Sequence, residues 1–331
     1  MHTKRIYTSS LLCMDTRVTF KVVTAASERD VEAGLDRAWA AFRHVEATCS
    51  RFDPQSELSR LTRRIGVAVP ASPALFEAIR FAWEVGQLTD GVFDPTVGAA
   101  MERRGFDRHY LTGERMLANR DIAAAEEDFA SAVPPVSYRD ILLDEERRTI
   151  ELTRPLTLDL GAVAKGLASD LAKRELESFG DFLIEAGGDV YAHGCNERGT
   201  PWRVGVRHPQ PFLIPNLLDL TDRPDALMGW IDVSGAAVCT SGGYERRAEL
   251  PQEHHLLDPR TGRSPQAAIS CTVIAPYAMM ADAFSTAAFI LGPEKGTALL
   301  DSLDLAGITI SNELQTNETK RMRGMWHEIA S

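Results

Sequence analysis

Three short stretches of the sequence carry residues whose types and spacing could do chemistry. In the first, residues 158–166 (LDLGAVAKG), a strand pattern passes through a glycine turn into a helix, with Lys165 in the first helical turn. Backbone N–H groups and an ammonium converge at such a corner, as an anionic phosphate requires. The Lys-Gly order and the missing upstream glycine exclude a Walker A loop. On this stretch alone, a solvated lysine at a strand–turn–helix corner is the simpler interpretation.

The second stretch, residues 280–287 (MADAFSTA), gathers possible metal ligands. Asp282 and Thr286 are four residues apart, so on a helix they share one face. A carboxylate, a hydroxyl and nearby carbonyls form the set of hard oxygens that suits Mg²⁺. The alternative is structural. Ser285 and Thr286 would then bond back to their own helix, and Asp282 would be a favourable charge in its first turn.

The third stretch, residues 254–262 (HHLLDPRTG), places two histidines before a turn. A histidine there could relay a proton near neutral pH, or it could be held in a purely structural hydrogen bond. In an extended segment His254 and His255 point to opposite sides, so they would not share a role.

Two smaller candidates leave the same choice open. Residues 91–96 (GVFDPT) form either a turn with an exposed aromatic side chain or only the end of a helix. Gly187 and Gly188, before Asp189, permit either a close approach of the backbone to a ligand or a simple bulge.

Composition bounds what these stretches could bind. The chain has 331 residues, 44% of them hydrophobic and 25% charged, which is typical of a globular protein. Its formal net charge of -11 argues against a nucleic-acid partner, because phosphate backbones are bound by basic surfaces. An anionic nucleotide would therefore need local positive charge from a metal, a lysine or a helix N-terminus. The five cysteines form no CxxC pair, so neither zinc nor a disulfide framework is indicated.

The sequence gives no sign of membrane insertion. No window approaches the length of a transmembrane helix. The only apolar run near the N-terminus, residues 11–14, is too short for the core of a signal peptide. We therefore expect a cytoplasmic protein with no membrane segment.

Hydrophobic periodicity and capping signals predict the elements that would position these residues. A strand is expected at 16–23, a helix after an N-cap at Ser27, and a helix from Ser72 to near Gly91. Further helices are expected at 162–179, 279–291 and 294–303. Further strands are expected at 149–153, 156–160, 182–191, 202–207, 231–239, 269–275 and 307–311. Residues 101–140 are interpreted as partly helical surface structure, a possible insertion. Strict βαβ alternation is absent, which favours an α+β fold in a single domain, 1–331.

Together and in this order, these stretches resemble the ApbE family of FAD:protein FMN transferases, and the match covers nearly the whole chain. The matching blocks are SELSRL (56–61), GVFDPTV (91–97), DLGAVAKG (159–166), GGD (187–189), TSGGYER (240–246), HLLDPRTG (255–262) and ADAFSTA (281–287). Three positions depart from the family's pattern. Thr62 stands where Asn is frequent, Leu167 where an aromatic is common, and Gly243 where a polar residue is usual.

The resemblance implies mixed sheets with packed helices, arranged as two lobes with an FAD cleft between them. It places Asp159 and Lys165 at the flavin nucleotide, and His255 matches the family's suggested base. The implied Mg²⁺ positions are the carbonyl of Ala162 and the side chains of Asp282, Ser285 and Thr286. The other implied FAD contacts are Met14, Phe52, Val92, Phe93, Asp94 and Leu256.

The activity implied by the resemblance is Mg²⁺-dependent transfer of FMN from FAD to a Thr or Ser hydroxyl of an acceptor protein, with release of AMP. The nearest alternative is an FAD pyrophosphatase, which uses water as the nucleophile and gives FMN and AMP. A non-catalytic FAD-binding protein is a third possibility. The presence of His255 and of all the metal positions favours catalysis, because a pure binder would not need them.

Overall fold

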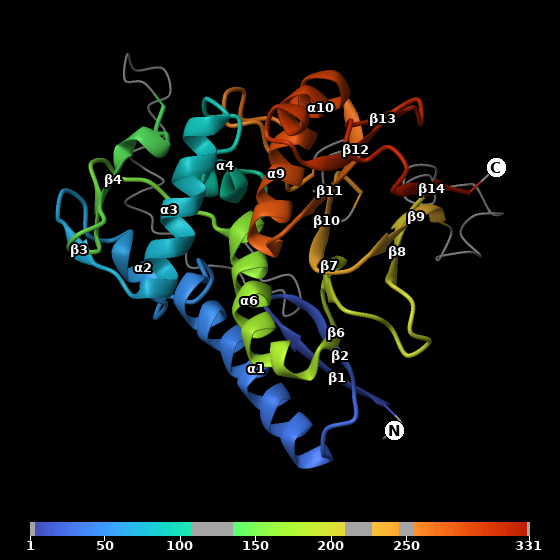
Figure 1. Cartoon of the computed structure of the whole chain (residues 1–331). Helices are drawn as coiled ribbons and strands as arrows, with labels where there is room; N and C mark the ends of the chain where they lie inside the picture. The colour runs from blue at the N-terminus through green and yellow to red at the C-terminus, as the bar shows by residue number, and fades with distance from the viewer. Residues whose placement is uncertain (1–3, 107–134, 209–226, 245–253, 330–331) are drawn as a thin grey trace.

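The computed structural model describes residues 4–106, 135–208, 227–244 and 254–329 (Figure 1). Its central feature is an eight-stranded antiparallel sheet in the order β1-β2-β6-β7-β10-β11-β12-β13. These strands are β1 (Arg5–Cys13), β2 (Thr16–Thr24), β6 (Asp181–Ala186), β7 (Asp189–His193), β10 (Ala236–Gly242), β11 (Ala268–Ala275), β12 (Ala306–Ser311) and β13 (Thr316–Glu318).

Helices cover one face of this sheet (Figure 1). They are α1 (Glu28–Cys49), α6 (Gly161–Leu176), α9 (Ala278–Leu291) and α10 (Pro293–Ser302). On β2, Val18, Phe20 and Val22 are every second residue, so they point to the same side and are fully buried in the core beneath the helices. Trp39 of α1 packs against Phe20 with 4.4 Å between ring centroids. Each buried side chain of this size contributes roughly 1.5–3 kcal/mol, so α1 is firmly anchored on the sheet.

A second, smaller sheet covers the opposite face. It contains β14 (Trp326–Glu328), β9 (Leu227–Val233) and β8 (Trp202–Arg207), in that order. Val23 of β2 and Val190 of β7 meet Trp202 and Ile231 in a separate core cluster. Val23 follows Val22 directly, so the alternation of the strand divides neighbouring side chains between two cores. The result is a layer of helices, the large sheet and a small sheet, which confirms the α+β fold class.

The remaining elements pack beside α1, α6 and α9, to the left in Figure 1. They are a small sheet of β3 (Val69–Pro70), β5 (Thr149–Leu152) and β4 (Ile141–Asp144), with the helices α2 (Glu57–Leu61), α3 (Pro73–Leu88) and α4 (Gly98–Arg103). Two 3₁₀ turns, η1 (Tyr138–Asp140) and η2 (Glu177–Phe179), complete the described elements. In the described ranges, no helix has both the length and the apolar character needed to cross a membrane.

Several predicted elements are confirmed with their caps. Ser27 and Ser72 are the N-caps of α1 and α3, and each hydroxyl accepts a hydrogen bond from the backbone N–H three residues later. The helices predicted at 162–179, 279–291 and 294–303 and the strands predicted at 16–23, 149–153, 202–207, 269–275 and 307–311 appear with small shifts of their ends.

Other predictions were wrong, for identifiable reasons. Residues 182–191 form two strands, because Gly187 and Gly188 take positive φ of 64° and 97° and turn the chain back on itself. Residues 231–239 likewise divide at Gly235 (φ 74°) into β9 and β10, which belong to different sheets. Residues 156–160 do not form the predicted strand. Their three leucines are buried, but the segment pairs with another one only through a single bridge between Thr157 and Val97.

Parts of the sequence gave no usable signal. The strands β1, β3, β4, β13 and β14 and the helix α2 were not predicted. Within the possible insertion at 101–140, residues 107–134 lie outside the described residues, and the ends of the segment are α4 and η1. The organisation as one domain of two lobes with a cleft between them stays a prediction.

Candidate functional site

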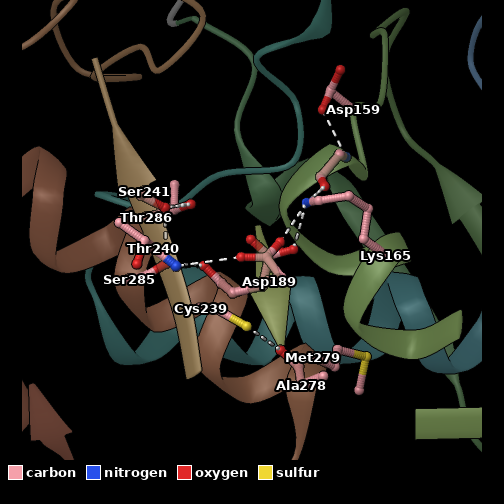
Figure 2. A network of polar contacts seen from close by, with 12 residues as sticks. Asp159, Lys165, Asp189, Cys239, Thr240, Ser241, Ala278, Met279, Ser285 and Thr286 are labelled. Carbon is pink, nitrogen blue, oxygen red and sulfur yellow. Dashed lines mark hydrogen bonds and ion pairs between the residues drawn. The ribbon is translucent and has the colours of Figure 1, made fainter. Parts of the chain in front are cut away.

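Lys165 lies where α6, α9 and the start of β7 meet (Figure 2). Lys165 was predicted to lie in the first helical turn. Because α6 begins at Gly161, it lies one residue beyond that turn. Its Nζ donates to Asp282 Oδ2 at 2.9 Å and to the carbonyl oxygen of Gly161 at 3.2 Å. It also forms an ion pair with Asp189 Oδ2 at 3.2 Å. One ammonium therefore faces two carboxylates, and the interpretation as a merely solvated lysine is wrong.

A group of hydroxyls continues from Asp282 along α9. Ser285 Oγ donates to the carbonyl oxygen of Asp282 at 2.9 Å, so the structural alternative, bonding back to the helix, is realised for Ser285. The hydroxyl of Ser241 on β10 lies 2.8 Å from Ser285 Oγ and 2.9 Å from Thr286 Oγ1 (Figure 2). All four residues are buried. The arrangement thus joins a carboxylate and three hydroxyls from two elements, and with Lys165 and Asp189 we call it the Lys165 cluster.

The close packing of α6 on α9 brings the cluster together. A side chain at Gly166 would collide with the backbone of Met279, and its Cβ would lie 2.6 Å from the carbonyl carbon of Ala278. Asp170, one turn later on α6, accepts the backbone N–H groups of Ala278 and Met279 at 2.9 and 3.0 Å. The first turn of α9 is therefore capped by a side chain of α6, which fixes Asp282 opposite Lys165.

The electrostatics of the cluster favour a cation. Burial raises the pKa of the Asp282 carboxyl to about 6, Lys165 opposes this shift, and the carboxylate of Asp189 adds to it. Two buried carboxylates against one ammonium leave a net negative charge in the cluster. A divalent cation bound beside Asp282 would offset that charge and favour the ionised carboxylate.

Asp159 lies just before the N-terminal end of α6, next to the buried side chain of Arg51. Asp159 Oδ1 accepts the backbone N–H of Gly161 at 2.8 Å, and Oδ2 accepts a hydrogen bond from Arg51 Nε at 2.5 Å. The guanidinium of Arg51 also lies over the ring of Phe52, 4.3 Å from its centroid. Ala162 is in the first turn of α6, three residues before Lys165. The structure thus brings two predicted FAD residues together through Arg51, which the sequence interpretation missed.

The turn containing Val92, Phe93 and Asp94 has a different character. Val92 and Phe93 are buried. Asp94 Oδ1 accepts hydrogen bonds from the backbone N–H and the hydroxyl of Thr96 at 2.9 and 2.8 Å, and Oδ2 accepts the N–H of Tyr138 at 2.9 Å. Burial raises the pKa of Asp94, and these hydrogen bonds oppose the shift. The carboxylate holds the turn in place, and its contact with FAD stays a prediction.

The two histidines differ in burial, and the prediction that they point to opposite sides stays a prediction. His254 is buried, its ring edge packs on Phe289, and its Nε2 lies 3.1 Å from the carbonyl oxygen of Pro265. A Cβ at Gly243 would lie 2.9 Å from this ring, which explains why the usual polar residue is replaced there. His255 is half-buried and follows directly. Buried His254 therefore fixes the segment that presents His255, while the role of His255 as a base stays a prediction.

The last two predicted FAD residues lie on other segments. Leu256 is buried in the large core. Met14 forms the tight turn between β1 and β2 with positive φ of 54°, and its N–H donates to Glu46 Oε1 at 2.6 Å. No described hydrogen bond or ion pair ties either residue to the Lys165 cluster, so both contacts stay predictions.

Three residues of the site were not predicted from the sequence: Arg51, Asp189 and Ser241. Asp189 and Ser241 had a usable signal, since each stands in a block that matches the family, GGD and TSGGYER. Arg51 lies outside those blocks and gave no signal. Among the described residues, no three His, Cys, Asp or Glu side chains gather closely enough to hold a metal. A metal here would need hydroxyl, carbonyl or substrate oxygens in addition to Asp282.

Comparison with known proteins identifies the family of the chain. The ApbE family model matches residues 14–309, so the chain belongs to the ApbE family. The FAD:protein FMN transferase of Escherichia coli (strain K12) is 30% identical over 250 residues, which cover 74% of this chain and 66% of that protein. The chain thus spans about two thirds of that relative's length.

Two further comparisons extend the match. The FAD:protein FMN transferase of Salmonella typhimurium is 30% identical over 273 residues, which cover 80% of this chain and 73% of that protein. The crystal structure of the ApbE protein from Thermotoga maritima superimposes with a TM-score of 0.79 at 26% identity, covering 97% of this chain and 99% of that one. The fold is therefore that of ApbE proteins over almost its whole length.

Proposed function

We propose that this chain transfers the FMN half of FAD to a Thr or Ser hydroxyl of an acceptor protein and releases AMP. The observation that carries the proposal is the Lys165 cluster: an ammonium, two carboxylates and three hydroxyls meet at the family's motifs. The relatives named above carry the same activity in their names. The chain has a net charge of -11, so a local cation is what an anionic dinucleotide needs.

The residues present fit a Mg²⁺ ion. Magnesium prefers oxygen ligands and keeps positions for water and phosphate, which suits one carboxylate with neighbouring hydroxyls and a backbone carbonyl. Asp282, Ser285, Thr286 and the carbonyl of Ala162 would hold it. Bound there, the ion would neutralise charge on the phosphates of FAD during displacement. Buried Asp282 is the charged ligand of this set, so it dominates the affinity for the ion.

The chain's own residues account for the remaining steps. Lys165 binds the diphosphate, and Asp159, held by Arg51, orients the nucleotide at the start of α6. The acceptor hydroxyl attacks the phosphorus on the FMN side, so a new P–O bond forms and the bond to AMP breaks. His255 takes the hydroxyl proton, which a neutral imidazole does well near pH 7. The enzyme thus supplies a base and no nucleophile of its own.

The test is to incubate the protein with FAD, Mg²⁺ and candidate acceptor proteins and to weigh the acceptors by mass spectrometry. The expected result is an acceptor that is heavier by one FMN less one water, with one AMP released for each acceptor modified. Release of free FMN and AMP with no labelled acceptor would indicate the FAD pyrophosphatase instead. Binding of FAD without any AMP would indicate a non-catalytic flavin protein.

A further inference from the structure

Asp189 is the charged member of the Lys165 cluster to which the proposed reaction gives no role. The β6–β7 hairpin places it at the first position of β7, directly after the Gly187-Gly188 turn and opposite Ala186. Its side chain is 11% exposed. Oδ2 lies 3.2 Å from Lys165 Nζ, and Oδ1 accepts the backbone N–H of Thr240 on β10 at 3.3 Å. The carboxylate is thus fixed on one side by the sheet and faces the lysine on the other.

The geometry points to a division of work between the two carboxylates. Lys165 Nζ contacts both Asp282 Oδ2 and Asp189 Oδ2. A cation bound by Asp282 would repel the ammonium and would neutralise part of that carboxylate's charge. Asp189 belongs to no predicted metal position, so its attraction for Lys165 persists when the ion is bound. A lysine side chain is flexible and loses considerable rotamer entropy when it is held in place.

We propose that Asp189 is a positioning residue, which holds the Lys165 ammonium toward the diphosphate of FAD while Asp282 binds Mg²⁺. This inference rests on the proposed function and deepens it. It explains why the turn before Asp189 consists of two glycines. Both take positive φ, and a Cβ on Gly187 would lie 3.1 Å from Cβ of Thr16. This tight turn sets the register that places Asp189 beside Lys165.

The experiment measures FAD affinity by calorimetry in saturating Mg²⁺, with turnover left aside. Asp189→Asn keeps the shape of the side chain and an oxygen for the Thr240 N–H but removes the charge. We expect the dissociation constant of FAD to rise roughly tenfold or more, the range for a charged hydrogen bond. Asp189→Glu keeps the charge and is expected to restore part of the affinity. The control, Asp232→Asn, removes a carboxylate that pairs with Arg203 in the small sheet, and should leave FAD affinity unchanged.

A double-mutant cycle with Lys165→Met shows whether Asp189 acts through the lysine. In the Lys165→Met background, Asp189→Asn should change the dissociation constant by less than about twofold, the limit for sites that no longer interact. An unchanged affinity in the single variant Asp189→Asn would overturn the inference alone. The inference would also be overturned if Asp189→Asn raised the dissociation constant of FAD as much in the Lys165→Met background as in the wild type. Asp189 would then act without the lysine. A wild-type protein that does not bind FAD with Mg²⁺ would overturn both this inference and the proposed function.

Discussion

Asp94 and Asp282 are both buried and both stand in motifs that match the family, but they differ in their partners. The difference distinguishes a carboxylate that stabilises the fold from one that is available for binding. Asp94 accepts three hydrogen bonds, two from Thr96 within its own turn and one from the backbone N–H of Tyr138 in η1. Asp282 faces an ammonium from another helix and a second carboxylate from a strand. The first carboxylate is satisfied by uncharged N–H and hydroxyl groups of its own turn and of η1. The second remains in a cluster of unbalanced charge, which a bound cation and nucleotide would complete.

His254 and His255, which are adjacent in the sequence, differ in a similar way. His254 is buried, and its backbone and ring bind Ser264 and Pro265. His255 is only half-buried. A family motif therefore contains residues of two kinds, those that shape the site and those that act in it. Burial and the origin of each hydrogen-bond partner distinguish them better than the motif does.

The largest expected effect is that of His255→Ala. If His255 is the base, its loss should lower turnover at saturating FAD by roughly 10²–10⁴-fold and leave FAD affinity nearly intact. The matched variant His254→Ala should instead cost roughly 1–3 kcal/mol of stability, because a buried hydrogen-bonded ring is lost. Its turnover, measured on folded protein, should stay near that of the wild type. If the His255→Ala variant stays active, another group takes the proton, and the proposed difference in role between the two histidines is wrong.

The next largest effect concerns the metal. Asp282→Ala removes the only carboxylate among the proposed Mg²⁺ ligands and should lower turnover on the order of 10²-fold or more, since the ion supplies several kcal/mol of charge stabilisation. Thr286→Ala should reduce turnover less, because a neutral hydroxyl contributes less charge to the ion. Both are measured as AMP release over a range of Mg²⁺ concentrations. Full turnover of the wild type in excess EDTA would contradict the assignment of the site.

Asp94→Asn tests the other side of the comparison. An amide keeps the shape but replaces one accepting oxygen by a donor, so a hydrogen bond from Thr96 or from the N–H of Tyr138 is lost inside the protein. We expect a loss of about 1–3 kcal/mol in the free energy of unfolding, measured with urea. FAD affinity of the folded variant should stay close to that of the wild type. A large loss of affinity with normal stability would show that the carboxylate itself touches FAD.

Local sequence signals predicted many of the helices and strands and all the quoted motifs, but they did not predict which elements contact one another. Periodicity and caps located α1, α3 and α9 because these signals are local. The strand β1 was missed because its turn uses Met14 and Asp15 at positive φ, where glycine or asparagine would have been the recognisable signal. Residues 156–160 looked like a strand because buried loops and strands share the same apolar composition.

The site shows the same limit. Lys165 and Asp282 are 117 residues apart, and each had an ordinary structural explanation when its own segment was considered alone. Only the packing at Gly166 and the capping of α9 by Asp170 bring the two side chains together. Family resemblance named Lys165, Asp282, Ser285 and Thr286 as residues of one site before the structure showed them in one cluster. It did not indicate Arg51, because the part of this residue in the site depends on its hydrogen bond to Asp159, 108 residues later in the sequence.

The smallest expected effect is a change in the free energy of unfolding, and it tests the comparison of Asp282 with Asp94 directly. Asp282→Asn should raise this free energy, whereas Asp94→Asn should lower it. Burial raises the pKa of Asp282 to about 6 from a usual 3.8. The folded, metal-free protein therefore binds a proton that the unfolded chain releases, and its stability falls as the pH rises through that interval. Asp282→Asn removes the titrating group. At pH 7 to 8 the variant should be more stable than the wild type, on the order of 1 kcal/mol.

The gain should fade as the pH is lowered from about 6 toward 3.8, and it should be gone below that value, where the carboxyl is protonated in the unfolded chain as well. Added Mg²⁺ should reverse the order at pH 7, because the ion stabilises a folded protein that binds it and the amide variant binds it weakly. Urea unfolding at several pH values, with EDTA and then with Mg²⁺, measures both effects. Stability that is lower in Asp282→Asn at every pH would mean that Asp282, like Asp94, serves the fold first. The two carboxylates would then no longer differ in kind.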